Sequence, residues 1–298
     1  MAVASLAMTP ARVWWSAVRP ATLAASVAPV LTGTAIGVHQ GGARWGAGLA
    51  ALMVGLGMQL GVNFANDYSD FVRGADAKRV GPVRAASSGI VEPSRVRAAS
   101  IAAFGAAGLA GLVLSLAVDW RLLIVGAACL LAGWLYTGGP RPYGYLGLGE
   151  LFVFVFFGLV ATVGTVYVET GRLTALAVVM ACAMGFLATA ILVLNNLRDI
   201  DTDAAAGKRT LATRIGRERT GLLLLVLVCA AFAVPIVALI THLAPVTVML
   251  VHFAIPIAAV PVRLAFATTA APGLVQALMR MAVAQLAYAL LFSLGILL

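Results

Sequence analysis

Charged residues are scarce in this chain of 298 residues: Asp, Glu, Lys and Arg make up 10% of it, against 62% hydrophobic residues. A soluble domain carries about 25% charged residues. The composition therefore excludes an ordinary soluble fold and, with a mean hydropathy of +1.03, indicates an integral membrane protein. Acidic residues are fewer than basic ones, 11 against 20, which gives the chain a net charge of +9.

Cysteine and histidine are also few. Cys129, Cys182 and Cys229 lie singly inside apolar segments, and the three histidines are scattered. Neither residue type shows the spacing of a metal site, and no Ser/His/Asp order suggests a hydrolase. The N-terminus lacks the pattern of a cleavable signal peptide, because the first apolar run, after Arg19-Pro20, is long enough to span a bilayer.

Long apolar segments fill most of the chain. Nine of them approach the ~20 residues that a bilayer requires, so we expect an all-α integral membrane protein with one domain over residues 1–298. The expected spans cover residues 20–39, 46–66, 95–117, 120–137, 147–168, 173–195, 221–241, 244–267 and 277–298.

The distribution of basic residues predicts the orientation. If the N-terminus is cytoplasmic, the outer loops hold only Arg44, Arg121 and Arg172, which leaves 17 of the 20 basic residues inside. Cytoplasmic loops of membrane proteins carry such an excess of Lys and Arg. The net positive charge is therefore explained by topology, and nucleic acid is not expected as a partner.

Two acidic motifs interrupt the apolar pattern. The first is Asn63-Phe64-Ala65-Asn66-Asp67-Tyr68-Ser69-Asp70, and the second is Asn195-Asn196-Leu197-Arg198-Asp199-Ile200-Asp201-Thr202-Asp203. On a helix, residues four apart share a face, which groups the polar side chains within each motif. Ionised groups at the end of a membrane span are costly unless they are paired, metal-bound or facing a wet cavity. Both motifs are therefore candidates for a functional site.

The two motifs are expected to meet. They close the second and sixth spans, and four crossings between them place both at the cytoplasmic side. Each is followed by a Lys-Arg pair, Lys78-Arg79 and Lys208-Arg209, which suggests a weak internal repeat of a four-helix unit. The Gly/Pro-rich turn from Tyr136 to Tyr145 joins them on the same side.

The residue types in these motifs suit a magnesium-bound diphosphate. Mg²⁺ prefers oxygen ligands and commonly sits between one or two carboxylates and substrate phosphates. We expect Asp67, Asp70, Asp199 and Asp203 to be the metal ligands and catalytic residues. Cationic side chains would neutralise the remaining phosphate charge, and an apolar cavity behind them would suit a polyprenyl tail. The expected substrate-binding residues are Asn63, Asn66, Arg79, Arg84, Arg141, Asn195, Lys208 and Arg209. The remaining acidic residues, Glu150 among them, are assigned no role.

The combined motifs resemble those of the UbiA-type aromatic prenyltransferases. The similarity rests on Asn66-Asp67-Tyr68-Ser69-Asp70, on Lys78 to Arg84 and on Asp199-x-x-x-Asp203. Within the family, residues 136–150 and 195–212 are most similar to the enzymes that prenylate 1,4-dihydroxy-2-naphthoate in menaquinone synthesis. One departure is Gly74, where the broader family often has a third aspartate; Asp76 follows two residues later.

The resemblance implies nine transmembrane helices around a central cavity and Mg²⁺ dependence. The implied reaction moves a prenyl chain from polyprenyl diphosphate to the naphthoate ring with loss of CO₂ and pyrophosphate, giving demethylmenaquinone. The implied location is the bacterial inner membrane, with the site on the cytoplasmic side. Arg141 and its turn would hold the diphosphate or the naphthoate carboxylate.

Two alternatives stay open. The acceptor could be 4-hydroxybenzoate, homogentisate or another ring, because the aspartates contact only the diphosphate. A secondary transporter of an anionic substrate is disfavoured, because transporters place their charges near mid-span and here they gather at one face.

Overall fold

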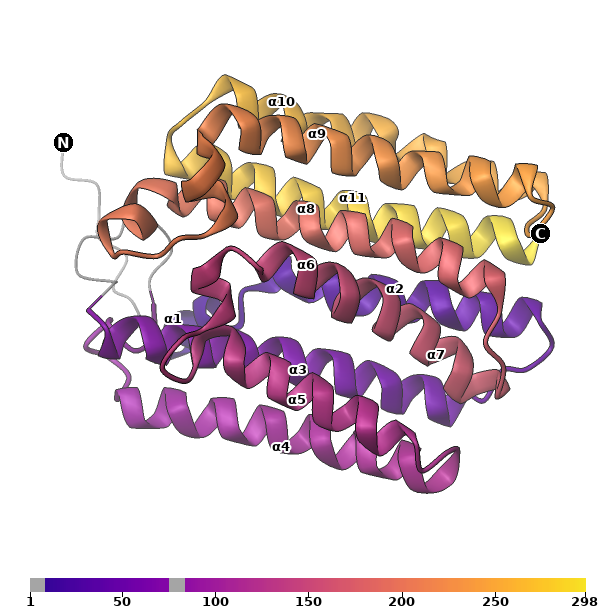
Figure 1. Cartoon of the computed structure of the whole chain (residues 1–298), viewed down its shortest axis with the longest axis horizontal. Coiled ribbons are helices and arrows are strands. Elements are labelled where there is room, and N and C mark those ends of the chain that lie inside the picture. The colour runs from indigo at the N-terminus through magenta and orange to yellow at the C-terminus, as the bar shows by residue number, and fades with distance from the viewer. Residues whose placement is uncertain (1–8, 75–83) are drawn as a thin grey trace.

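The computed structural model describes residues 9–74 and 84–298, and every regular element in these ranges is helical. The helices lie nearly side by side in one bundle (Figure 1). In chain order the elements are α1 (Pro10–Val18), α2 (Pro20–His39), α3 (Trp45–Val72), α4 (Pro93–Ala117), α5 (Leu122–Thr137), η1 (Tyr143–Leu146), α6 (Gly149–Val153), η2 (Phe154–Val160), α7 (Ala161–Thr170), α8 (Ala175–Ala205), α9 (Leu211–Ile240), η3 (Val246–Ala254), α10 (Ile255–Ala267) and α11 (Ala271–Leu297). The all-α membrane class is therefore confirmed.

The number of spans differs from the expectation. In the described part of the chain, eight helices are long and apolar enough to cross a bilayer. The expected span that is missing from these eight is the fourth, over 120–137. It corresponds to α5, whose 16 residues extend only about 24 Å at 1.5 Å per residue, short of the ~30 Å hydrocarbon core. The count of nine is not confirmed, and the orientation stays a prediction.

Both acidic motifs lie within continuous helices. α3 runs to Val72 and α8 to Ala205, because neither motif contains glycine or proline before Gly74 and Gly207, which both adopt positive φ. The helical phase assumed for both motifs is therefore correct. The stretch between the expected spans 173–195 and 221–241 is largely helix. α8 runs to Ala205, and α9 begins at Leu211 with a kink at Gly216, whose backbone is not helical (φ 81°, ψ 168°).

α8 forms the centre of the bundle and is the most deeply buried of the candidate spans. It packs in the main apolar core with α2, α9 and α11. The contact with η2 depends on two glycines, because a Cβ at Gly158 would stand 2.4 Å from the Cα of Gly185. This close packing brings η2 against the middle of α8.

A small second core lies beneath the first motif. Val13 and Ala17 of α1 pack there with Phe64 of α3 and with Ala85 and Ala86 of the segment before α4. The part of α3 around Phe64 is thus covered by α1 and by the segment before α4.

Candidate active site

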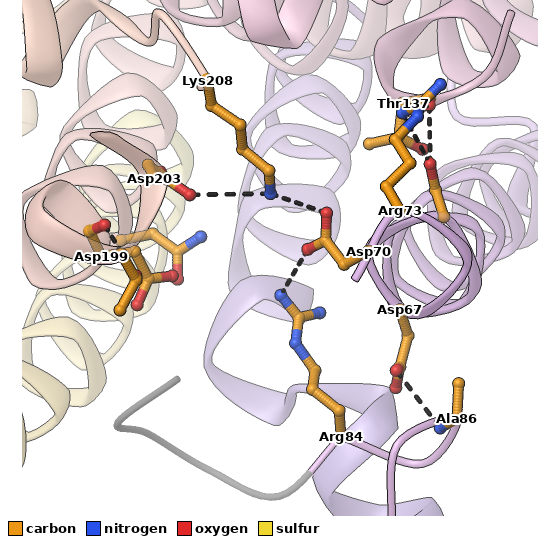
Figure 2. A network of polar contacts seen from close by, with 12 residues as sticks. Asp67, Asp70, Arg73, Arg84, Ala86, Thr137, Asp199, Asp203 and Lys208 are labelled. Carbon is orange, nitrogen blue, oxygen red and sulfur yellow. Dashed lines mark hydrogen bonds and ion pairs between the residues drawn. The ribbon is translucent and has the colours of Figure 1, made fainter. Parts of the chain in front are cut away.

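The two acidic motifs meet at one end of the bundle, where Lys208 bridges them. Its Nζ lies 2.6 Å from Asp70 Oδ1 and 3.6 Å from Asp203 Oδ1, and Arg84 Nη2 lies 3.2 Å from the other oxygen of Asp70. Figure 2 shows the lysine reaching between the two carboxylates. Asp70, Arg84 and Lys208 are all buried, so these are close contacts in a low-dielectric setting.

The turn before α6 also reaches this network, through a tyrosine. The hydroxyl of Tyr145 donates to Asp70 Oδ1 at 2.8 Å, and the ring of Tyr145 lies 4.8 Å from Lys208 Nζ. Burial and the neighbouring charge of Asp70 raise the pKa of Tyr145. Burial alone would lower the pKa of Lys208, but the charges of Asp70 and Asp203 outweigh it and raise that pKa. The bridge therefore consists of a protonated lysine and a neutral tyrosine.

Asp67 points away from this bridge. Its two oxygens accept the backbone N–H groups of Ala85 (2.9 Å) and Ala86 (3.3 Å), and its side chain is fully buried. Three residues along the same helix, Asp70 faces Lys208 instead. The two aspartates of the first motif therefore occupy different environments.

Asp199 is neutralised by the neighbouring residue. Arg198 Nε and Nη2 lie 2.8 Å and 2.7 Å from its two oxygens, and Nη2 also donates to Asn195 Oδ1 at 2.6 Å. This paired arrangement orients Asp199 and Asn195 together on α8, toward the same end as Asp203.

The asparagine Asn63 fixes the start of α2. Its amide nitrogen donates to the carbonyl of Val18 (2.9 Å) and to Thr22 Oγ1 (3.0 Å). Between these two partners lies Arg19, a residue with left-handed backbone (φ 52°). Such a conformation is uncommon outside glycine, and it persists where the surrounding contacts hold it. Asn63 is one such contact.

A cavity of about 220 Å³ opens beside the network. Its walls are apolar residues of α2, α3, α4, α5, η2, α7 and α8, while the end near the motifs carries the polar side chains of Arg19, Asn63, Asn66, Tyr136 and Asn195. Aromatic rings form part of the wall near that end, including Tyr143 and Phe152, which stack with centroids 3.9 Å apart. A small polar group with a long apolar tail would match this shape.

The remaining expected residues lie apart from the network. Arg141 is exposed and is absent from the cavity lining. Arg209 is also exposed, although its backbone N–H donates to the carbonyl of Tyr145 at 3.0 Å. Arg79, like Asp76, lies outside the described residues.

Sequence reasoning missed several members of the site. Tyr145 and Arg198 belong to the Gly/Pro-rich turn and to the second motif, but their contacts depend on side-chain direction, which a sequence motif does not give. Arg19 was noted only as the start of a span. Glu150, which was assigned no role, is buried and accepts a hydrogen bond from Asn196 at 2.9 Å. Its burial next to a second-motif residue could have been predicted from its position at the start of an apolar run.

The donor set suits Mg²⁺ only together with further ligands. Within residues 9–74 and 84–298, no three Asp, Glu, His or Cys side chains converge as a preformed metal cage. The carboxylates at this end nevertheless supply oxygen donors in pairs, and Mg²⁺ commonly takes one or two carboxylates plus substrate phosphates. Each carboxylate oxygen also has a second lone pair beyond the contacts described above. The residues therefore fit a magnesium ion whose remaining ligands are water or the phosphates of a substrate.

Comparison with known proteins gives consistent matches. The model of the UbiA prenyltransferase family matches residues 26–283. A 1,4-dihydroxy-2-naphthoate octaprenyltransferase of Mycobacterium tuberculosis is 49% identical over 210 residues, 70% of this chain and 72% of that protein. An Escherichia coli protein of the same name is 38% identical over 230 residues, 73% and 75% of the two chains.

A solved structure has the same fold at low sequence identity. The UbiA homolog from Archaeoglobus fulgidus bound to GPP and Mg²⁺ aligns with a TM-score of 0.62 and 14% identity, over 94% of this chain and 99% of that one.

Proposed function

The chain belongs to the UbiA prenyltransferase family and is a prenyltransferase, and on that premise we propose that it prenylates 1,4-dihydroxy-2-naphthoate from a polyprenyl diphosphate, with Mg²⁺. The products would be demethylmenaquinone in its reduced form, pyrophosphate and CO₂. The observation that carries the proposal is the meeting of both acidic motifs around Lys208, at the polar end of an apolar cavity. The names of the relatives support the acceptor.

The four aspartates Asp67, Asp70, Asp199 and Asp203 are the proposed ligands of the metal. When bound, the ion would stabilise the negative charge on the departing diphosphate. Asp70 and Asp203 are the best placed for this role, because one lysine already joins them. Asp67 and Asp199 have other contacts, through which they orient the segment before α4 and the asparagine Asn195.

The cationic side chains of the network would bind the diphosphate. Lys208 and Arg84 both contact Asp70, so each can turn toward phosphate oxygens without leaving the site. Arg79 and Arg209 are further proposed phosphate contacts, each from the stretch of sequence that follows one motif. Such charge-assisted contacts stabilise the charge that develops on the leaving group.

The cavity would hold the prenyl tail and keep water from the reacting carbon. When the C–O bond to the diphosphate breaks, that carbon gains positive charge, which the faces of nearby aromatic rings stabilise. Tyr143 and Phe152 line the cavity and stack on each other, so they are the proposed rings. The ring of the acceptor then forms the new carbon–carbon bond, and the bond to its carboxylate breaks to release CO₂.

The acceptor carboxylate needs a cation at the mouth of the cavity. Arg19 lines the cavity next to Asn63 and Asn66, whereas Arg141 is exposed. Of the two arginines, Arg19 is the better proposed partner for the naphthoate carboxylate, and Arg141 would act only outside the cavity.

We also propose nine spans with a cytoplasmic N-terminus, in a bacterial inner membrane. The support is the placement of 17 of 20 basic residues on one side. This orientation places the network of Lys208 at the cytoplasmic face, where a water-soluble diphosphate head group would be accessible.

The decisive test is turnover by purified protein with farnesyl diphosphate, dihydroxynaphthoate and Mg²⁺. We expect pyrophosphate release together with a prenylated, decarboxylated product, and loss of both on chelation of the metal or in Asp199→Asn. Parallel reactions with 4-hydroxybenzoate and homogentisate compare the acceptors. Faster turnover of either would refute the naphthoate assignment, and full activity in both Asp199→Asn and Asp67→Asn would refute the metal assignment.

A further inference from the structure

The cavity continues far beyond the polar end, toward the opposite side of the bundle. On α5 both Tyr136, at the polar end, and Leu122 line it. These residues are 14 positions apart, about 21 Å along the helix at 1.5 Å per residue. The cavity therefore has a distal half, well removed from the chemistry.

Three glycines from three different helices line the distal half: Gly111 of α4, Gly126 of α5 and Gly164 of α7. A Cβ placed at Gly126 or Gly164 meets no described atom within 4 Å, and at Gly111 the nearest described atom is Val54 Cγ2 at 3.9 Å. By contrast, a Cβ at Gly133, also in the lining, would stand 2.8 Å from Met58 Cε. Gly126 and Gly164 thus face empty space, and a Cβ at Gly111 would stand at ordinary van der Waals distance from Val54, so no described neighbour requires a glycine at any of the three positions.

Close packing does not account for these glycines, and neither does backbone conformation. All three lie inside helices, and none has positive φ, so alanine would be the more stable choice at each position. What their missing side chains provide is width in the cavity.

The glycines lie at successive depths. Gly126 is ten residues from Tyr136 along α5, about 15 Å. Val54, beside Gly111, is twelve residues from Asn66 along α3, about 18 Å. The depth of Gly164 is given by its neighbour Thr165, which packs against Gly33 of α2. Gly33 is 14 residues from Arg19 along the chain, about 21 Å of helix.

Resting on the proposed function, we propose that Gly126, Gly111 and Gly164 set the length of prenyl tail that the cavity accepts. An extended isoprene unit adds four carbon–carbon bonds, about 5 Å. A geranyl tail would end before Gly126, a farnesyl tail would end level with it, and a geranylgeranyl tail would pass the first two glycines and reach the third. A bulky residue at one of these positions would then exclude only the tails that extend past it.

The test compares Gly126→Phe and Gly111→Phe with wild type, using geranyl, farnesyl and geranylgeranyl diphosphates and saturating dihydroxynaphthoate with Mg²⁺. Gly105→Phe is the matched control, because Gly105 is an exposed residue of α4 outside the cavity lining whose Cβ also meets no described atom within 4 Å. In Gly126→Phe we expect kcat/KM for the geranylgeranyl donor to fall about tenfold or more relative to the geranyl donor, since burial of at least one isoprene unit is lost. The farnesyl donor should lose less in Gly111→Phe than in Gly126→Phe, and the control should keep the wild-type ratios.

Two results would overturn the inference: unchanged donor ratios in both cavity variants, or an equal loss for all three donors. Turnover of the geranyl donor verifies that each variant is folded, and Gly126→Leu repeats the test with a smaller side chain. Failure of the proposed function is distinguishable, because wild type would then transfer none of the three tails.

Discussion

Replacing Lys208 by methionine tests whether this residue holds the two motifs together. Its ammonium group contacts both Asp70 and Asp203, and the Lys208 side chain is buried. Removing one partner of a buried ion pair costs about 3–5 kcal/mol, because the other charge is left uncompensated. At about 2 °C per kcal/mol, the thermal midpoint of the metal-free protein in detergent should fall by about 6–10 °C.

Magnesium should restore more stability to the variant than to wild type. In wild type the ion competes with Lys208 for Asp70 and Asp203, and in Lys208→Met it does not. A ligand at 100 times its Kd stabilises the folded protein by about 2.7 kcal/mol, and the stabilisation grows as the Kd falls. If the variant binds Mg²⁺ more tightly, the same Mg²⁺ concentration therefore raises its thermal midpoint further. Intrinsic tryptophan fluorescence during a thermal ramp, with and without Mg²⁺, measures both effects.

The matched control removes a cation from an exposed pair. Arg95 Nε lies 3.5 Å from Glu92 Oε2, with both side chains largely exposed, and such pairs contribute about 0–1 kcal/mol. Arg95→Met should therefore leave the midpoint nearly unchanged. The reasoning is refuted if Lys208→Met is as stable as this control without metal, or if Mg²⁺ raises both midpoints equally.

Three further outcomes are expected. The midpoint difference between wild type and Lys208→Met should stay constant from neutral pH to about pH 10 and shrink only above it. The reason is that the pKa of Lys208 is raised above its ordinary 10.5, so the bridge is lost only as pH rises through that raised value. Arg19→Ala should raise KM for dihydroxynaphthoate about tenfold or more, the effect of losing a charged hydrogen bond of ~1.5–3 kcal/mol, whereas Arg141→Ala should change it less than about twofold; equal effects would argue against Arg19. In Asp67→Asn, hydrogen exchange at the amides of Ala85 and Ala86 should accelerate, and unchanged exchange would show that Asp67 does not hold that segment.

Much of the architecture follows from local sequence signals. Apolar runs located the helices. The four-residue separations of Asn63 from Asp67 and of Asn195 from Asp199 predicted that both motifs are helical, which the structure confirms. Convergence of the motifs at one end followed from counting crossings between them. These features depend on periodicity and chain direction, which a sequence carries directly.

Other features depend on contacts between distant segments. Asp67 and Asp70 look equivalent in the sequence, yet one faces backbone N–H groups and the other faces Lys208. Likewise, Tyr145 and Arg141 lie in one turn, but only the tyrosine reaches the network. The direction of each side chain is set by how the turn and the segment before α4 pack onto α3, and no local pattern encodes that packing.

The contacts of Asp67 and Asp70 connect the two residues in series. Asp67 accepts the backbone N–H of Ala85, and Arg84, the residue before Ala85, contacts Asp70. The first aspartate therefore fixes the backbone from which the arginine extends to the second. A substitution at Asp67 would then weaken diphosphate binding by displacing Arg84, even where Asp67 contributes no ligand oxygen. The spacing of the motif thus gives its two carboxylates different partners, and we expect a substitution at either to weaken diphosphate binding, for a different reason in each case.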